Sequence, residues 1–395
     1  FWIWVGRLSG LIAVGRRLAA YAPRVAGGLT RFRPLPWLLD ATLPLLLWWA
    51  LMNDRWERVT VDALSWSFEQ FPRLQGLPFW YIYSALIAVT LILALVLLAR
   101  RPLRFALAVA LSIAVLAGNQ LGSPAHLLSR ERTFFGVHTV NFLQLRSGQF
   151  HVFLSGTTIH GAQQFEGEEQ GLPVTYYTRD GPVGLFFSAA RQAQHSFEDI
   201  AVIGLGVGSL SCYAHTGENI TFFEIDPAVE RIARDERYFT FLSDCGRDAE
   251  VRIGDGRLKI AAEPDESFDL IVLDAFSSDA IPVHLLTREA FQVYLRKLKP
   301  DGLLLVHITN EYLDLQPVIS NVAADLGLAA RILTHRASQR SRYQFPSDWV
   351  AIGRTVNDVA MLDRSPRKWV AMAPKRRHGV WTDDFSNIVR VLRWD

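Results

Sequence analysis

The stretch 201–209, AVIGLGVGS, decides the fold of this chain. It is an apolar run that breaks at Gly204, Gly206 and Gly208. We predict a buried strand that turns into a helix there, because a backbone that bends sharply against a ligand has no room for Cβ atoms. In dinucleotide-binding turns, G-x-G-x-x-G, the third glycine lets the helix pack closely while its N-terminus holds a pyrophosphate. Here Ser209 takes that third position, which favours a ligand with ribose and adenine but no phosphate, such as S-adenosylmethionine.

Acidic residues follow the next three predicted strands. Glu224 ends ITFFE at the interval where an acid accepts hydrogen bonds from the two hydroxyls of a ribose. Asp255, beside Gly256, ends the third strand, and Asp274 ends FDLIVLD with Asp279 five residues later. Open α/β sheets bind ligands at the carboxyl ends of their strands. These residues therefore predict a nucleoside site in a Rossmann-like domain.

Composition narrows the class of protein. The chain has 395 residues, enough for two or three domains, and 50% of them are hydrophobic. The formal net charge of +2 gives no reason to expect a nucleic-acid partner. Cys212 and Cys245 show neither metal-ligand spacing nor a disulfide framework, which leaves the compartment open but fits a reducing one. We expect no metal site.

The apolar excess lies in the first third of the chain. Segments 77–99 and 105–121 are long and uncharged, and 35–52 is about the length of a short span. Segment 1–22 contains arginines and is either part of a spanning helix or an amphipathic helix in the membrane interface. We therefore expect residues 1–122 to form transmembrane helices that anchor the protein and contact membrane lipid.

The orientation of these helices is ambiguous. The basic turn 100–104 should be cytoplasmic by the positive-inside rule, which would place the C-terminal part outside. Arg130 and Arg132 argue for the opposite orientation. Because adenosylmethionine is made in the cytosol, we expect a multi-pass protein of the inner or plasma membrane with a cytoplasmic catalytic domain.

Two domains are expected after the membrane segments. Residues 133–190 alternate apolar and polar side chains between turn residues, which predicts short strands and a small β-rich domain over 123–196. A Rossmann-like catalytic domain with a C-terminal extension should follow over 197–395, with helices at 287–298 and 315–326. The fold class is thus α/β, a Rossmann-like S-adenosylmethionine-dependent transferase with a small N-terminal β-domain and preceding transmembrane helices.

With these residues in view, the chain resembles the spermidine synthase family of aminopropyltransferases, in particular its bacterial membrane-fused members. The resemblance covers about residues 131–390 and rests on several ordered motifs. They are FFGVHTV, SGTTIHGAQ, TYYTRDGPVG, VIGLGVGSL, FFEIDP, IGDGR, LDAFSSDAIPVHLLT and WTDDFSN. It implies a small β-domain, a Rossmann-like domain and an active-site lid formed by the segment after Asp274.

The resemblance also implies roles for single residues. Glu224 corresponds to the ribose-binding acid and Asp255 to the acid that reads the adenine amine. Asp274 resembles the acid that helps to deprotonate the attacking amine, with Asp279 in the lid. Tyr177 corresponds to a tyrosine of the substrate pocket.

Three further residues are candidates for binding the substrate. His160 lies in a short turn, where it could donate to substrate or could simply be a structural histidine. Asp383 and Asp384, in WTDDFSN, could bind a polycation or cap the final helix. Asp274 itself could be only a turn acid after a buried strand.

The leading hypothesis is a transfer of an aminopropyl group from decarboxylated S-adenosylmethionine to a small amine such as putrescine. One departure favours a rival. Val207 stands where soluble members carry an acid for the amine of the donor, so the alternative is an S-adenosylmethionine-dependent methyltransferase with a membrane-associated acceptor. A third reading is a non-catalytic nucleoside-binding module. A homodimer is compatible with each of these readings, and the sequence leaves the assembly open.

Overall fold

The computed structural model describes residues 125–393 apart from 146–147, 157, 167–169, 277–281, 311, 337–343, 376 and 378. The predicted membrane segments within 1–122 lie outside the described residues. In the range that is described, every helix is too short or too polar for a bilayer crossing.

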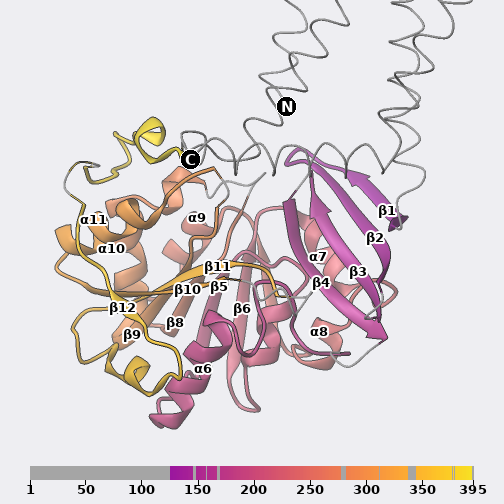
Figure 1. Cartoon of the computed structure of the whole chain (residues 1–395), viewed down its shortest axis with the longest axis horizontal. Helices are drawn as coiled ribbons and strands as arrows, with labels where there is room; N and C mark the ends of the chain where they lie inside the picture. Colours follow the sequence, from indigo (N-terminus) through magenta and orange to yellow (C-terminus); the bar gives the residue numbers. More distant parts are fainter. Residues whose placement is uncertain are drawn as a thin grey trace, which may run out of the picture. The chain divides into compact units, whose positions relative to one another are not determined.

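The described chain begins with a four-stranded antiparallel sheet in the order β1-β2-β3-β4 (Figure 1). Its strands are β1 (Ala125–Arg132), β2 (Val137–Leu145), β3 (Gly148–Ser155) and β4 (Thr158–Glu166). Val140 of β2 and Phe153 of β3 are buried in the core that this sheet shares with the rest of the described chain. The prediction of a small N-terminal antiparallel sheet is confirmed.

The segment after this sheet differs from the sequence prediction. We expected strands as far as residue 190, but Pro182–Gln192 forms the helix α6. Gly181 and Pro182 carry the local signal, since proline is favoured at the first position of a helix, where its missing N–H costs no hydrogen bond. Most of the apolar residues that follow Pro182 are therefore buried on a helix and do not form a strand.

The α/β part that follows is built on an eight-stranded sheet with the strand order β12-β10-β11-β9-β8-β5-β6-β7. The strands are β5 (Asp199–Ile203), β6 (Asn219–Glu224), β7 (Glu250–Ile253), β8 (Phe268–Leu273), β9 (Leu298–His307), β10 (Ala329–His335), β11 (Ser347–Gly353) and β12 (Val370–Ala371). β7, β6, β5, β8 and β9 are parallel neighbours. In chain order they lie as 3-2-1-4-5, so the connection reverses direction between β5 and β8, where open α/β sheets bind ligands.

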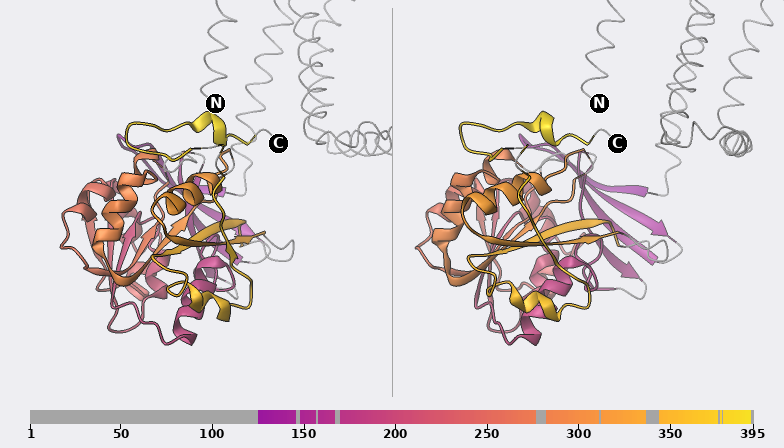
Figure 2. Two further views of the ribbon diagram at one scale, coloured as in Figure 1. Left: turned by 90° about the vertical axis from the view of Figure 1, so that its left-hand side faces the viewer. Right: turned by 60° about the vertical axis from the view of Figure 1, so that its left-hand side comes forward.

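Helices cover both faces of this sheet (Figures 1 and 2). One face is covered by α6, α7 (Pro227–Arg234) and α8 (Phe241–Asp244), and the other by α9 (Gly256–Ala261), α10 (Arg288–Lys297) and α11 (Gln316–Asp325). Single turns of 3-10 helix occur at η2 (Ser209–Tyr213), η3 (Val283–Leu285), η4 (Ala360–Arg364) and η6 (Ile388–Val391). Along β5, Val202 packs on the first face, and Ala201 and Ile203 pack on the second. The continuous apolar runs of the sequence thus reflect strands that are buried on both sides.

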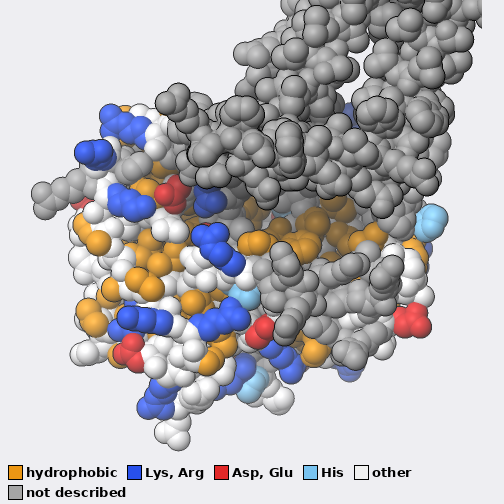
Figure 3. All heavy atoms as spheres, viewed as in Figure 1, with side chains coloured by type: hydrophobic (Ala, Val, Ile, Leu, Met, Phe, Trp, Pro, Cys, Tyr) orange, Lys and Arg blue, Asp and Glu red, His pale blue; other side chains and the backbone are white. Residues whose placement is uncertain are grey.

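The surface of the described part mixes charged and apolar side chains. On the face seen in Figure 3, Lys and Arg side chains lie scattered among hydrophobic ones. Phe134 and Val389 are among the exposed large hydrophobic side chains. Positive charge is therefore not gathered into one continuous patch on this face.

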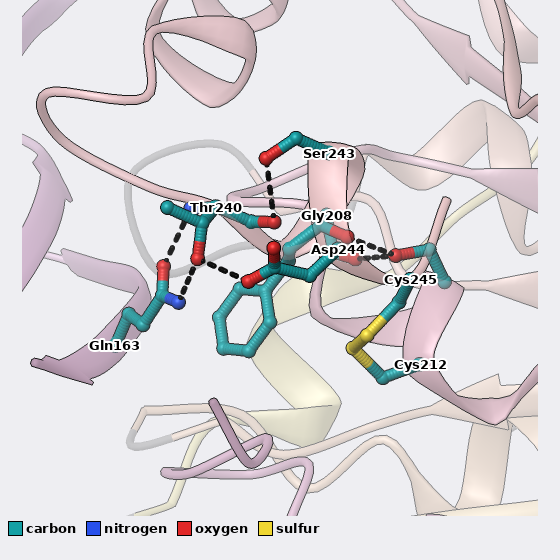
Figure 4. Close-up of a disulfide and its surroundings, with 9 residues drawn as sticks. Gln163, Gly208, Cys212, Thr240, Ser243, Asp244 and Cys245 are labelled. Atoms are coloured by element: carbon teal, nitrogen blue, oxygen red, sulfur yellow. Dashed lines mark hydrogen bonds between the residues drawn. A yellow bond between two sulfur atoms is a disulfide. The ribbon is translucent and has the colours of Figure 1, made fainter. Parts of the chain in front are cut away.

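A disulfide joins Cys212 of η2 to Cys245 at the end of α8 (Figure 4). The two residues are separated by 33 positions, and their Cα atoms lie 4.8 Å apart. Beside the bond, the Ser211 hydroxyl lies within hydrogen-bond distance of the carbonyl oxygens of Gly208 and Phe241. The α8 segment thus supports the turn that follows β5. The sequence showed no disulfide framework, because the pairing depends on contact between segments that are distant in sequence.

We predict that the double variant Cys212→Ser/Cys245→Ser loses about 2–4 kcal/mol of unfolding free energy, because a disulfide restricts the unfolded chain. The midpoint of chemical denaturation measures this loss. Adding a thiol reductant to the wild type should lower the midpoint to that of the variant, and the reductant should leave the variant unchanged. Equal midpoints for the oxidised wild type and the variant would show that the bond does not stabilise the fold.

Candidate active site

A cavity of about 1100 Å³ lies where the central parallel strands end. Its walls include the residues that follow β5, β6, β7 and β8, together with the last residue of β9. Phe153, Ile159 and His160 of the four-stranded sheet form another part of the wall. Both sheets therefore contribute to a single site, at the position that the strand order predicts.

The glycine turn forms one wall of this cavity. Gly204 has a φ of 103°, and a Cβ added there would lie 2.3 Å from the carbonyl oxygen of Asp274. A Cβ at Gly206 would lie 2.7 Å from the carbonyl oxygen of His160. Both positions thus need glycine because neighbouring backbone comes so close, and both line the cavity.

The rest of the turn faces away from the cavity. Gly208 contacts the Leu242 side chain of α8 and is not among the cavity residues, although we predicted it as a cofactor residue. Val207 is 1% exposed and packs against Gly161, where an added Cβ would lie 2.5 Å from Val207 Cγ2. The side chain at position 207 therefore packs between the two sheets and is not among the cavity residues.

Glu224 is fixed by the backbone that surrounds it. Its carboxylate accepts hydrogen bonds from the N–H groups of Leu205, at 3.0 Å, and Asp226, at 2.9 Å. Burial raises the pKa of Glu224, while the backbone hydrogen bonds act in the opposite direction. The result is a pre-oriented acceptor on the cavity wall, next to the glycine turn.

Asp255 lies on the same wall and caps α9. Its Oδ1 accepts the N–H of Leu258 at 2.9 Å, and its Oδ2 lies 3.1 Å from Nε2 of His284. Gly256 follows, where an added Cβ would lie 2.5 Å from the Ile203 side chain. Glu224, Asp255 and Gly256 thus meet beside the turn. His284 was missed by the sequence analysis because it lies in η3, away from any strand end.

Asp274 lies on the cavity wall at the end of β8. The Tyr177 hydroxyl donates a hydrogen bond to Oδ2 of Asp274 at 2.8 Å. Burial, followed by the charge of Asp274, raises the pKa of Tyr177 well above its ordinary value. Tyr177 therefore stays protonated and donates to the carboxylate.

A histidine that we did not select completes this group. His307 ends β9, and its Nδ1 lies 2.7 Å from Oδ1 of Asp274. The signal was present in the sequence, since His307 is the polar residue at the carboxyl end of the apolar run GLLLV. The rule that selected Glu224 and Asp274 would have selected it too.

Of the other predicted site residues, one lines the cavity and the rest do not or lie outside the described residues. His160 lines the cavity, with its ring 5.8 Å from that of Phe153. Asp279 lies outside the described residues. Asp383 and Asp384 are not among the residues that line this cavity, and their role in binding substrate stays a prediction.

Asp383 has a different set of partners. It binds Arg257 through two hydrogen bonds of 2.7 Å, and the Thr287 hydroxyl donates to it at 2.7 Å. These hydrogen bonds, with that of Arg257 the strongest influence, lower the pKa of Asp383 to about 2. Thr287 also caps α10. Asp383 thus attaches the C-terminal segment to the start of that helix.

We predict that Asp383→Asn reduces the unfolding free energy at neutral pH by about 0.5–1 kcal/mol, since the pair is partly exposed. A lowered pKa in the folded state stabilises the protein above the ordinary pKa, and this contribution is lost as the pH falls through about 2. The difference between variant and wild type should therefore shrink between pH 4 and pH 2 in denaturation measurements. A loss of nucleoside affinity at unchanged stability would instead assign Asp383 to the site.

The chain is similar in sequence to curated polyamine aminopropyltransferases. The chain is 38% identical over 115 residues to a polyamine aminopropyltransferase of Vibrio vulnificus, a match covering 28% of this chain and 37% of the relative. It is 28% identical over 194 residues to a probable polyamine aminopropyl transferase of Bifidobacterium longum, covering 48% of this chain and 40% of that protein. The chain thus spans less than half the length of these curated relatives.

Among solved structures, a probable spermidine synthase from Corynebacterium glutamicum is 15% identical with a TM-score of 0.46, covering 63% of this chain and 90% of that chain. The spermidine synthase from Thermotoga maritima is 14% identical with a TM-score of 0.43, covering 63% and 81%. No family model matches the chain. The sequence matches support the resemblance to the spermidine synthase family of polyamine aminopropyltransferases.

Proposed function

We propose that residues 125–393 form an aminopropyltransferase that uses decarboxylated S-adenosylmethionine and a small amine such as putrescine. One observation carries the proposal. The Asp274 carboxylate contacts the side chains of Tyr177 and His307. It lines the same cavity as the glycine turn and the acids Glu224 and Asp255. This arrangement can hold a nucleoside and an amine next to one another.

The chemistry follows from these groups. The nitrogen lone pair of the acceptor amine attacks the propyl carbon bonded to the sulfonium, and the C–S electron pair leaves with sulfur as a neutral thioether. The amine proton passes to the Asp274 carboxylate, since a protonated amine has no lone pair for the attack. Because the leaving group departs neutral, catalysis depends mainly on holding the two reactants in line.

Replacement of Asp274 tests its role directly. We expect Asp274→Asn to lower turnover by at least about 100-fold, the usual contribution of a general base, while nucleoside affinity stays within about tenfold, roughly one hydrogen bond. Turnover is measured as spermidine formed from putrescine and decarboxylated S-adenosylmethionine, and affinity by calorimetry. Asp363→Asn, at an exposed ion pair with Arg331, is the matched control. Wild-type turnover in Asp274→Asn would show that another group takes the proton.

The identity of the donor separates this proposal from its rival. Position 207 is a valine, which has no carboxylate for a donor amine, and it is buried against Gly161. This favours a methyltransferase with a membrane-associated acceptor as the second candidate. We expect calorimetry to give tighter binding of decarboxylated S-adenosylmethionine than of S-adenosylmethionine. Glu224→Ala should weaken whichever nucleoside binds by about 10- to 150-fold.

The opposite order of affinities would favour methyl transfer. Absence of binding for both donors would favour the third reading, a module without catalysis.

The location of the protein is also a proposal. We propose that the apolar segments 77–99 and 105–121 anchor the domain in the membrane and that the domain lies on the cytoplasmic side, where the donor is made. The Cys212–Cys245 disulfide favours the opposite side, since disulfides are rare in the cytosol. A C-terminal fluorescent-protein fusion should fluoresce if the domain is cytoplasmic, and an active C-terminal alkaline phosphatase would refute this orientation.

A further inference from the structure

His307 is a buried titratable residue that takes no proton in the proposed reaction but contacts the carboxylate that does. Its side chain is 3% exposed, and that of Asp274 is 6% exposed. The Nδ1–Oδ1 distance of 2.7 Å puts the two groups in direct hydrogen-bond contact on the cavity wall. A buried histidine against a carboxylate that lines a cavity is a candidate for a functional role.

The surrounding hydrogen bonds assign a proton to Nδ1. An ionised Asp274 only accepts, so a proton of His307 lies on Nδ1. Nε2 of His307 lies 2.6 Å from the Thr309 hydroxyl oxygen. That oxygen also accepts the backbone N–H of Asp348 at 2.8 Å and keeps one lone pair and one proton, so Nε2 can either accept from the hydroxyl or donate to it. In either case Nδ1 donates to the Asp274 carboxylate.

Aromatic packing fixes the plane of the ring. His307 stacks on Trp349 with the ring centroids 4.3 Å apart and an angle of 4° between the planes. The Phe276 ring meets it edge-on at 4.9 Å. Trp349 is fully buried. The stacking thus fixes the plane of the ring, and within that plane the contacts of Nδ1 with Asp274 and of Nε2 with Thr309 set which edge faces the carboxylate.

We propose that His307 is a positioning residue for Asp274. Nδ1–H holds Oδ1 while Tyr177 holds Oδ2, so the carboxylate is fixed at both oxygens and presents a remaining lone pair to the cavity. Thr309 lies one step further away, where its hydroxyl contacts Nε2 on the other side of the ring. The contribution to turnover rests on the proposed function, whereas the proton on Nδ1 does not.

The proton on Nδ1 is tested first, by long-range 1H–15N NMR of the whole protein, with the His307→Phe spectrum assigning the signal. We expect Nδ1 of His307 to carry a proton in the wild type, because it faces the Asp274 carboxylate. Protonation at Nε2 alone in the wild type would overturn the inference. This measurement needs no substrate, so it decides the proposal even if the proposed activity is absent.

Two substitutions then separate positioning from packing. His307→Phe keeps a ring on Trp349 but removes the donor, and His307→Asn keeps a donor near the position of Nδ1 but removes the ring. With putrescine and decarboxylated S-adenosylmethionine, we expect kcat of His307→Phe to fall about 10- to 150-fold, the effect of one hydrogen bond to a charged group. His307→Asn should retain kcat within about tenfold. KM for the donor should be unchanged in both.

The control is His215→Asn at an exposed histidine, which should behave as the wild type. A purely structural role predicts the reverse order, with His307→Phe active and His307→Asn impaired, and that result would overturn the proposal. Equal losses in both variants, together with lower thermal stability, would do the same.

Discussion

The close approach of two backbones at Gly204 is the constraint on which the rest of the site depends. A side chain there would collide with the carbonyl oxygen of Asp274, because an added Cβ would lie 2.3 Å from it. Glycine thus allows the turn after β5 and the end of β8 to lie directly against each other. These are the two strands between which the chain reverses its order in the sheet. The nucleoside turn and the proposed base are therefore neighbours as a consequence of the fold.

A second close contact joins the two sheets. Gly161 of β4 lies against Val207, and Gly206 lies against the backbone of His160. The four-stranded sheet therefore covers the turn with backbone and apolar side chains. It also adds Phe153 and Ile159 to the cavity wall. Val207 thus has a packing role between the two sheets.

Much of the site could be predicted from the sequence because parallel strands bring their carboxyl ends together. Glu224, Asp255 and Asp274 were found in this way, and the same reasoning reaches His307 once the fifth strand is included. What could not be predicted depends on contacts between distant segments. Asp383 stands in an acidic motif, yet its partner Arg257 lies 126 positions away. α6 was missed because its apolar residues are buried so extensively that they show neither helical nor strand periodicity.

The disulfide between Cys212 and Cys245 means that the chain must be oxidised before its covalent structure is complete. Closing the bond removes two electrons and two protons from the thiols, so an electron acceptor must be present when the chain matures. Cys212 belongs to the helical turn that follows Gly208, and Cys245 is exposed at the end of the segment that supports it. A newly synthesised chain therefore reaches the covalent structure described here only after it has met an oxidant.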